Sequence, residues 1–466
     1  MAETTFALFF GNRGFFPESL IAGAREEMVG AVKKAGYGAL TLDAGATRYG
    51  AVESPAEGKV YADFLAANRA KIDGVILCLP NFGDETGAVA ALQDAGVPIL
   101  VQAYPDELDK MDMSVRRDAF CGKFSVMDVF YQYGVKFTTF QPHTVHPSSE
   151  MFAQHLRCFA ATCDVVKRMR RLTIGAIGAR TTAFKTIRFD ELALQREGIT
   201  TETFDLSDVF QRFEATKDSD DAARTKVEFL REYTKWKGVP EDALLKMGRL
   251  GAVLDGMIEE FQLDSIALRC WLELEKQLGI SPCVLLSELN NRGIAAACEL
   301  DVCNAVAMTA LTTASHHPAT CLDWNNNYGE DPEKCILFHC GPVPQDLMTE
   351  KGQIVDHPMF VKVLGPGCGY GCNTGRISPA PMTFASTKTH EGKLHYYLGE
   401  GRITEDQIPP EFFGCAGVAQ IDGLQDVLET VGHEGYRHHV SVTFDHVAKP
   451  VREAFDKYLG YTSTRI

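Results

Sequence analysis

The sequence predicts an α/β protein with two tandem, doubly wound parallel-sheet domains, 1–165 and 166–315, followed by a mostly antiparallel β domain, 316–466. Three observations indicate this fold class. Continuous apolar runs such as 74–79 and 172–177 alternate with amphipathic helical stretches, which is typical of a parallel sheet covered on both faces. Beyond residue 315 the helical periodicity weakens. Glycine, proline and short β-like runs take over there and favour antiparallel strands.

The N-terminal domain is expected to contain strands at 6–10, 40–42, 74–79 and 98–102, with helices at 18–34 and 61–72. Polar loops at 11–14 and 80–85 follow two of these strands. Ligands of open α/β sheets bind at such carboxyl ends.

The central domain shows the same alternation of strands and helices. Its strands are expected at 172–177, 200–205, 264–270 and 293–298, and its helices at 189–198, 210–237, 241–261, 272–278 and 301–311. The C-terminal domain is expected to have strands at 335–338, 360–363, 382–386, 394–398 and 439–444, and a final helix at 447–459.

The composition limits the classes of function. A formal net charge of −16 argues against binding to nucleic acid or to an anionic membrane surface. No apolar run approaches the ~20 residues that span a bilayer. The first residues lack the basic and apolar regions of a signal peptide. Most of the 14 cysteines stand singly in apolar runs, as reduced core cysteines do, so a cytoplasmic protein is expected.

Four polar residues stand where buried apolar runs stop: Glu299, Asp323, His339 and His439. Two carboxylates and two imidazoles suit a divalent metal such as Mn²⁺. A carboxylate at such a site can also move protons on a bound substrate. Each residue taken singly is more often structural, as a hydrogen-bonded histidine or a capping aspartate. The hypothesis of one site therefore depends on all four coming together.

Three other motifs suggest a nucleotide, zinc or dinucleotide site, but each departs from the pattern that such a site requires. The glycine-rich run 365–375 lacks the Gly-Lys-Ser/Thr ending of a phosphate loop. The cysteines at 335, 340, 368 and 372 are not spaced as the paired CxxC of structural zinc sites. The run 175–178 follows a strand but lacks the third glycine of a dinucleotide-binding fingerprint.

The segment Gly-Ile-Ala-Ala-Ala-Cys-Glu-Leu-Asp-Val-Cys-Asn-Ala-Val-Ala-Met (293–308) resembles the metal-site segment of the L-fucose isomerase family. In that family a Glu-X-Asp follows a buried strand, and a second Asp lies 24 positions after the Glu, which corresponds to Asp323 here. The late segment His-His-Val-Ser (438–441), followed by His-Val at 446–447, resembles the segment that carries the family's metal-binding histidine, which corresponds to His439. Related L-arabinose isomerases have one more histidine, and His339 fits it. Segments 171–180 and 189–191 resemble the start of the family's middle domain.

The resemblance implies a metal-dependent aldose–ketose isomerase that works through a cis-enediol intermediate. It implies that Glu299 and Asp323 both bind the metal and transfer protons, while His339 and His439 hold the metal. The metal would be Mn²⁺, with Co²⁺, Mg²⁺ and Zn²⁺ as alternatives. It further implies a homo-oligomer, a hexamer in the family, whose active site is shared between subunits. The partner is a small-molecule sugar, with no nucleic acid and no membrane.

The candidate substrate-binding residues are polar or aromatic and fall into three groups. Arg13 and Asp84 lie in first-domain loops that, by the resemblance, would complete a neighbouring subunit's pocket. Arg180 and Lys185 could meet an anionic substrate group. The remaining candidates are Trp271, Trp324 and His438. Trp271 belongs to the run Arg269-Cys270-Trp271, at the middle-domain strand where fucose isomerases have a substrate-binding glutamine. In a continuous strand His438 would point opposite to His439.

Two alternatives stay open. Because Trp271 and His438 depart from the family pattern, the same chemistry could serve a metal-dependent lyase, epimerase or decarboxylase acting on an acidic or sulfonated sugar. The two tandem α/β domains also resemble periplasmic-type binding proteins in their order of strands and helices. The second alternative is therefore a non-catalytic sugar-binding protein.

Overall fold

The structure is a computed structural model that describes residues 4–466. Its contacts divide the chain into two compact units. The first runs to Lys167 and includes Arg452–Gly460, and the second comprises Arg168–Val451 and Tyr461–Ile466. Most of the stretches expected to form the central and C-terminal domains lie in the second unit, whereas Arg452–Gly460, from the end of the chain, belong to the first.

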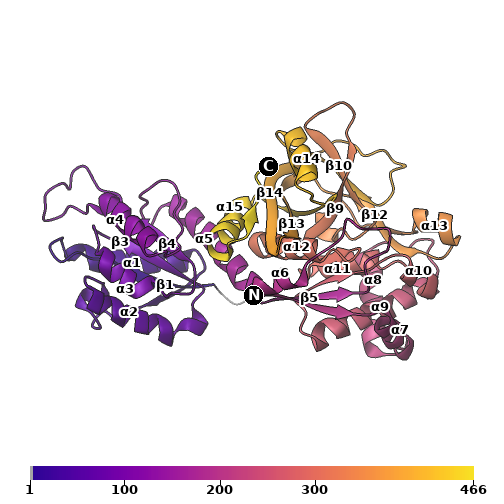
Figure 1. Ribbon diagram of the computed structural model, residues 1–466, viewed down its shortest axis with the longest axis horizontal. Coiled ribbons are helices and arrows are strands. Elements are labelled where there is room, and N and C mark those ends of the chain that lie inside the picture. The colour runs from indigo at the N-terminus through magenta and orange to yellow at the C-terminus, as the bar shows by residue number, and fades with distance from the viewer. Residues whose placement is uncertain (1–3) are drawn as a thin grey trace. The chain divides into compact units, whose positions relative to one another are not determined.

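The first unit is a parallel sheet with strand order β2-β1-β3-β4 and helices on both faces (Figure 1). Residues of β1 and β3 are buried on both sides, which is why these strands read as continuous apolar runs. Helices α1 and α5 cover one face, and α2, α3 and α4 cover the other. The strands are β1 (Thr5–Phe10), β2 (Gly38–Thr41), β3 (Gly74–Leu79) and β4 (Ile99–Ala103), and the helices are α1 (Ser19–Lys34), α2 (Pro55–Ala67), α3 (Glu85–Leu92), α4 (Ala119–Gln132) and α5 (Glu150–Met169).

The second unit begins with another four-stranded parallel sheet, in the order β6-β5-β7-β8. One of its faces packs on a large apolar cluster from α7, α8, α9 and α11. The strands are β5 (Leu172–Ile177), β6 (Ile199–Phe204), β7 (Ser265–Leu268) and β8 (Ala296–Cys298), and the helices are α6 (Glu191–Arg196), α7 (Leu206–Ala215), α8 (Asp221–Tyr233), α9 (Glu241–Glu260), α10 (Glu273–Leu278) and α11 (Cys283–Asn291).

A mostly antiparallel sheet follows in the order β11-β12-β15-β10-β9-β16-β13-β14-β17. An additional pairing of β14 with β15 closes the strands between them into a barrel-like ring. The strands are β9 (Ala319–Asn327), β10 (Lys334–His339), β11 (Gln353–Asp356), β12 (Tyr370–Arg376), β13 (Ala380–His390), β14 (Lys393–Ile403), β15 (Cys415–Gln420), β16 (His439–Phe444) and β17 (Thr462–Ser463). The helices are α13 (Pro358–Leu364), α14 (Leu424–His433) and α15 (Ala448–Glu453), which continues as a π-helical turn at Ala454–Leu459.

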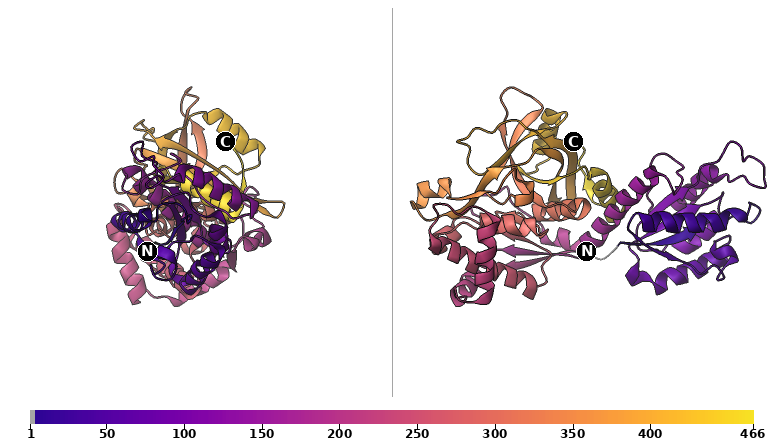
Figure 2. Two further views of the ribbon diagram at one scale, coloured as in Figure 1. Left: turned by 90° about the vertical axis from the view of Figure 1, so that its left-hand side faces the viewer. Right: turned by 180° about the vertical axis from the view of Figure 1, so that it is seen from behind.

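Helix α12 (Val302–Ser315) lies between the two sheets of the second unit and is buried along almost its whole length. It packs against β7 and β8 on one side and against β9, β13 and β16 on the other. Its many alanines allow the close approach that a helix between two sheets requires. Figure 2 shows the strands of the antiparallel sheet, in orange and yellow, on one side of this helix. The start of α12 therefore meets the strand ends of both sheets.

The expected fold class is confirmed, with two local corrections. The run 360–363 was expected to be a strand, but it lies in helix α13, which Pro358 opens at its first turn. The charged stretch 210–237 was expected to be one helix, but it forms α7 and α8 with a break between them. Asp220 at the start of α8 accepts a hydrogen bond from the backbone N–H of Lys217 and so stabilises the intervening turn.

Candidate active site

Glu299 stands at a sharp turn between β8 and α12. Glu299 and Leu300 both have left-handed backbones, with φ of 60° and 65°. Such conformations cost about 1–3 kcal/mol each for residues other than glycine and cluster at functional sites. The turn ends at Asp301, whose side chain caps α12 by accepting from the backbone N–H of Asn304 at 3.1 Å. The Glu299 carboxylate is thereby held at the tip of a buried strand.

The antiparallel sheet supplies the other three residues from three adjacent strands. Asp323 lies in β9, directly opposite His439, the first residue of β16. On its other side β9 pairs with β10, where Phe338 is opposite Asp323 and His339 is the last residue. Residues directly opposite each other across antiparallel strands point to the same face, so the strand register places Asp323 and His439 side by side.

His439 is the centre of the cluster. Its Nε2 lies 3.0 Å from Oε2 of Glu299 and 3.4 Å from Oδ1 of Asp323. Its Nδ1 lies 2.9 Å from Oδ2 of Asp301. Asp301 is itself fully buried and is paired with Arg437, whose Nη1 is 3.3 Å from Oδ1. Asp301 therefore fixes the imidazole through Nδ1, and Nε2 faces the carboxylates of Glu299 and Asp323.

Aromatic side chains surround this cluster. The Trp271 indole donates its Nε1–H to Oε1 of Glu299 at 3.0 Å. Phe184 packs edge-on against Trp271 and His438, with ring centroids 5.7 and 5.4 Å apart, and its ring also contacts His439. These contacts orient the Glu299 carboxylate and form an apolar wall beside it.

A cavity of about 460 Å³ opens onto the cluster, a size usual for small-molecule sites. Glu299, Asp323 and His339 line it, together with mostly apolar side chains. Two buried polar atoms of the cluster have no hydrogen-bond partner in the described part of the chain: Oδ1 of Asp323 and Nε2 of His339. Buried polar atoms are normally paired, so unpaired ones that converge on a cavity indicate a ligand site.

Burial and neighbouring charges shift the pKa values of Asp323 and Glu299 in opposite directions. Burial raises the pKa of Asp323 to about 7, with the Glu299 charge adding to the effect and His439 opposing it. Burial alone would raise the pKa of Glu299, but its hydrogen bond and charge interaction with His439 hold that pKa below its ordinary value. Burial lowers the pKa of His339 to about 4. For His439, burial is outweighed by Cys321, Asp301 and Glu299, which raise its pKa well above the ordinary value.

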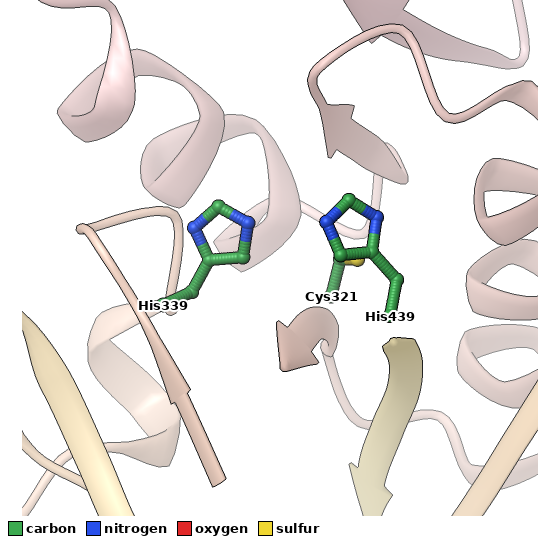
Figure 3. A group of neighbouring side chains, drawn as sticks. All are labelled: Cys321, His339 and His439. Carbon is green, nitrogen blue, oxygen red and sulfur yellow. The ribbon is translucent and has the colours of Figure 1, made fainter. Parts of the chain in front are cut away.

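These donors suit a divalent cation. Carboxylate oxygens and imidazole nitrogens are ligands of Mn²⁺, Co²⁺ and Zn²⁺. The negative charges that favour a proton on His439 would equally favour a metal ion in its place. Two groups of ligand atoms lie within 4.8 Å of one another: Glu299 with His438 and His439, and Cys321 with His339 and His439. Figure 3 shows the second group, with the two imidazole rings directed toward each other and Cys321 beside His439.

Of four other residues expected at the site, one lines the cavity and three do not. His438 lines the cavity, and its Nε2 is 3.7 Å from Oδ1 of Asp323. It lies in a bend just before β16, so it does not point away from His439 as in a continuous strand, and the two rings are 4.5 Å apart. Trp324 faces the barrel core instead, where it donates to the Tyr397 hydroxyl at 3.2 Å. Arg180 and Lys185 are not among the cavity-lining residues.

Arg13 and Asp84 belong to the first unit, at the carboxyl edge of its sheet. Arg13 donates to the carbonyl of Gly83 at 2.8 Å and pairs with Glu85. Asp84 caps α3 by accepting from the backbone N–H of Gly87 at 2.7 Å. Both side chains thus have structural partners within their own unit.

Sequence reasoning missed four residues around the cluster. Asp301 has no assigned role in the sequence analysis beyond the Asp of the Glu-X-Asp segment, although its position at the start of a helix predicts a cap. Phe184 lies between the two basic residues that were proposed instead of it. Arg437 and Cys321 carry no local signal, because only the packing of α12 against β9 and β16 brings them to the cluster.

A buried cluster of acids and imidazoles facing a cavity between an α/β sheet and a barrel-like sheet defines a candidate enzyme active site, and comparisons with known proteins specify its class. Residues 7–170 match the fucose/sulfoquinovose isomerase N-terminal domain, and residues 337–465 match the L-fucose isomerase C-terminal domain. The chain belongs to the L-fucose isomerase family of sugar isomerases, as a fucose isomerase-like member. Glu299 and Asp323 lie between the two matched regions, and His339 and His439 lie within the second.

Similar curated proteins carry related names. The sulfoquinovose isomerase of Alkalicoccus urumqiensis is 25% identical over 66% of this chain and 68% of its own length. The sulfoquinovose isomerase of Priestia aryabhattai is 21% identical over 86% of this chain and 87% of its own length. Among solved structures, a periplasmic solute-binding protein from Actinobacillus succinogenes with bound D-allose is 12% identical over 67% of this chain and 92% of that chain, and its TM-score of 0.17 supports no inference.

Within residues 4–466, none of the helices combines the length and the apolar character that a membrane span requires.

Proposed function

We propose that this protein is a metal-dependent aldose–ketose isomerase that acts through a cis-enediol intermediate. The observation that carries the proposal is the convergence of Glu299, Asp323 and His439, from three separate stretches of the chain, on one point beside a cavity. Oδ1 of Asp323, which has no hydrogen-bond partner among the described residues, and Nε2 of His439, which faces both carboxylates, are atoms that a divalent metal would engage. Family membership adds independent support for sugar isomerisation.

Glu299, Asp323 and His439 would hold the metal, with Mn²⁺ favoured and Co²⁺, Mg²⁺ and Zn²⁺ as alternatives. When bound, the cation would polarise the sugar's carbonyl and hydroxyl oxygens and acidify the adjacent C–H bond. The Glu299 and Asp323 carboxylates transfer the proton between C1 and C2 and between the adjacent oxygens. The Trp271 indole keeps Glu299 in place, and Phe184 packs edge-on against that indole. His339 is the fourth ligand expected from the sequence, and its ring centroid lies 5.7 Å from that of His439. Its Nδ1, however, accepts a hydrogen bond from the backbone N–H of Cys340, whereas Nδ1 of His439 faces Asp301.

The proposed substrate is a sugar, and two observations favour different classes of sugar. The curated relatives are named sulfoquinovose isomerases, which favours a sulfonated sugar. Among the described residues, however, those that line the cavity include no lysine or arginine, which favours an uncharged aldose. Trp271 and His438 line the cavity and are proposed to contact the bound sugar.

The remaining proposals concern assembly. Family resemblance supports a homo-oligomer, a hexamer in the family, in which the first unit of a neighbouring subunit completes the cavity. Arg13 and Asp84 are candidates for that contribution, and a cation supplied in this way would be needed to recognise a sulfonate.

The proposal is tested with protein stripped of metal, reconstituted separately with Mn²⁺, Co²⁺, Mg²⁺ or Zn²⁺, and screened by NMR against neutral aldoses and acidic or sulfonated sugars. We expect conversion of an aldose to its ketose, with deuterium from D₂O entering at C1 or C2 because the proton passes through a carboxylate. Turnover of acidic or sulfonated sugars alone would identify the substrate class, whereas products of cleavage, epimerisation or decarboxylation would favour the alternative enzyme classes. A metal-free protein that binds sugar without turnover would favour a sugar-binding protein.

Glu299→Gln separates the acid–base role of Glu299 from metal binding. The amide retains an oxygen for the metal but accepts no proton, so the rate should fall by about 10²–10⁴-fold. Full turnover by this variant with the metal still bound would refute the acid–base assignment.

A further inference from the structure

The two histidines that face each other across the site differ in what holds their Nδ1 atoms. For His439, Nδ1 faces Oδ2 of Asp301 at 2.9 Å, and a carboxylate only accepts. Nδ1 of His439 therefore carries a proton, and in the neutral ring the lone pair is on Nε2. This is the tautomer that binds metal.

His339 has the opposite arrangement. The backbone N–H of Cys340 donates to Nδ1 of His339 at 2.9 Å, so this nitrogen uses its lone pair as an acceptor. In the neutral ring the proton is then on Nε2. That Nε2 is buried and has no hydrogen-bond partner among the described residues, and His339 is one of the residues that line the cavity. Figure 3 shows the ring directed toward His439, with ring centroids 5.7 Å apart.

Binding a metal through Nε2 of His339 would require its proton to move to Nδ1. Nδ1–H would then face the Cys340 N–H, and two donors would oppose each other. Leaving a buried donor unpaired is unfavourable, because the donor loses its hydrogen bond to water without gaining another. The same cost weighs against a metal held by Cys321, His339 and His439, which would need both Nε2 lone pairs.

We propose that His339 is a catalytic hydrogen-bond donor, not a metal ligand: its Nε2–H binds the substrate oxygen on which negative charge develops during proton transfer. This inference rests on the proposed isomerase function. A donor already fixed in a cavity with mostly apolar walls and directed at developing charge stabilises the transition state more than the ground state. The strand end of β10 and the Cys340 hydrogen bond fix its orientation before substrate arrives.

The test compares His339→Ala and His339→Gln with His439→Ala as the matched control. Metal affinity is measured by titration calorimetry with Mn²⁺, and the ligand set is followed by the visible spectrum of the Co²⁺-loaded protein. We expect both His339 variants to keep Mn²⁺ affinity within about threefold and to keep the wild-type Co²⁺ spectrum. His439→Ala should lose at least tenfold in affinity.

Turnover supplies the second measurement. His339→Ala should lower kcat by about 10²–10³-fold, the usual effect of removing one such donor, with a smaller change in KM. His339→Gln should recover part of the loss, because its amide can donate a hydrogen bond. If His339→Ala fails to fold by circular dichroism, the glutamine variant alone decides, by its metal affinity and spectrum.

Loss of Mn²⁺ affinity or a changed Co²⁺ spectrum in the His339 variants would show that His339 is a ligand and overturn the proposal. Unchanged kcat in His339→Ala would overturn it as well. Failure of the isomerase function is distinguishable, because wild-type protein would then bind no divalent metal or convert no aldose.

Discussion

Asp301 and His439, 138 residues apart in the chain, are joined by a hydrogen bond of 2.9 Å between Oδ2 and Nδ1. Asp301 also accepts from the backbone and side chain of Asn304 and pairs with Arg437. One buried carboxylate thus connects the start of α12 with the start of β16. It fixes the orientation of the imidazole at the centre of the site.

Asp301→Asn should weaken the binding of Mn²⁺ by about 10–100-fold, the usual effect of losing the group that orients a metal-binding histidine. The amide keeps the shape of the side chain but removes its charge, so the imidazole is a poorer ligand. Titration calorimetry on the folded variant measures the change. Asp426→Asn, at an exposed position in α14, is the control and should bind as the wild type does. Wild-type affinity in Asp301→Asn would contradict the connection between Asp301 and metal binding.

Trp271→Phe should lower kcat/KM by roughly 10–100-fold. The change removes the indole N–H that donates to Glu299, and a hydrogen bond to a charged group contributes about 1.5–3 kcal/mol. Steady-state kinetics with the best aldose measures it. Trp236 donates in the same way, but to the carbonyl of Leu230 and away from the cavity. Trp236→Phe should therefore keep wild-type kinetics, and equal effects of the two substitutions would count against an orienting role for Trp271.

Glu275→Gln should stabilise the protein in a pH-dependent manner. Burial raises the pKa of Glu275 from its ordinary value to about 7. Ionising Glu275 therefore costs more in the folded than in the unfolded protein, and wild-type stability falls as pH rises from about 4.5 to about 7. The variant lacks this loss, so its advantage should be near zero below pH ~4 and on the order of 3 kcal/mol above pH ~7, at 1.36 kcal/mol per pKa unit.

Urea denaturation at pH 4.5 and pH 8 measures that difference. Glu273→Gln is the control, because Glu273 lies on the same helix but is 37% exposed and pairs with Arg269. It should show no such pH-dependent gain. A constant difference between Glu275→Gln and wild type across this range would mean that Glu275 has an ordinary pKa.

Binding of Mn²⁺ should stabilise the second unit. A ligand that binds only the folded state adds about 2.7 kcal/mol at a free concentration of about 100 times Kd. Denaturation with EDTA and with excess Mn²⁺ measures the increase. His433→Ala removes an exposed histidine of α14 and should keep the full increase, whereas His439→Ala should lose most of it. An equal increase in both variants would place the metal elsewhere.

Much of the fold was predictable because it follows from local periodicity. Continuous apolar runs such as those of β3 and β5 predicted buried parallel strands, and the expected strand at 439–444 coincides with β16. The error at 360–363 has a local cause, since a short apolar run with β-branched residues is compatible with either a strand or a buried helix face.

The candidate site was predictable only in part. Glu299, Asp323, His339 and His439 could be chosen because a polar residue at the end of an apolar strand needs a partner or a ligand. Trp324 was proposed beside Asp323 on equal grounds, but strand alternation directs it into the barrel core. Deciding which of two adjacent residues faces the cavity requires the register of the sheet.

The sequence by itself determined the kinds of secondary structure, the family and the chemical character of the site, because these depend on residue type, spacing and local pattern. Only the tertiary structure decided that His439 lies opposite Asp323, that Nδ1 of His439 faces Asp301, and that Nδ1 of His339 accepts from the backbone N–H of Cys340. The physical reason is that a hydrogen bond depends on which atoms face each other at about 3 Å. That arrangement is set by strand pairing and by the packing of α12 between two sheets, across more than a hundred residues of chain.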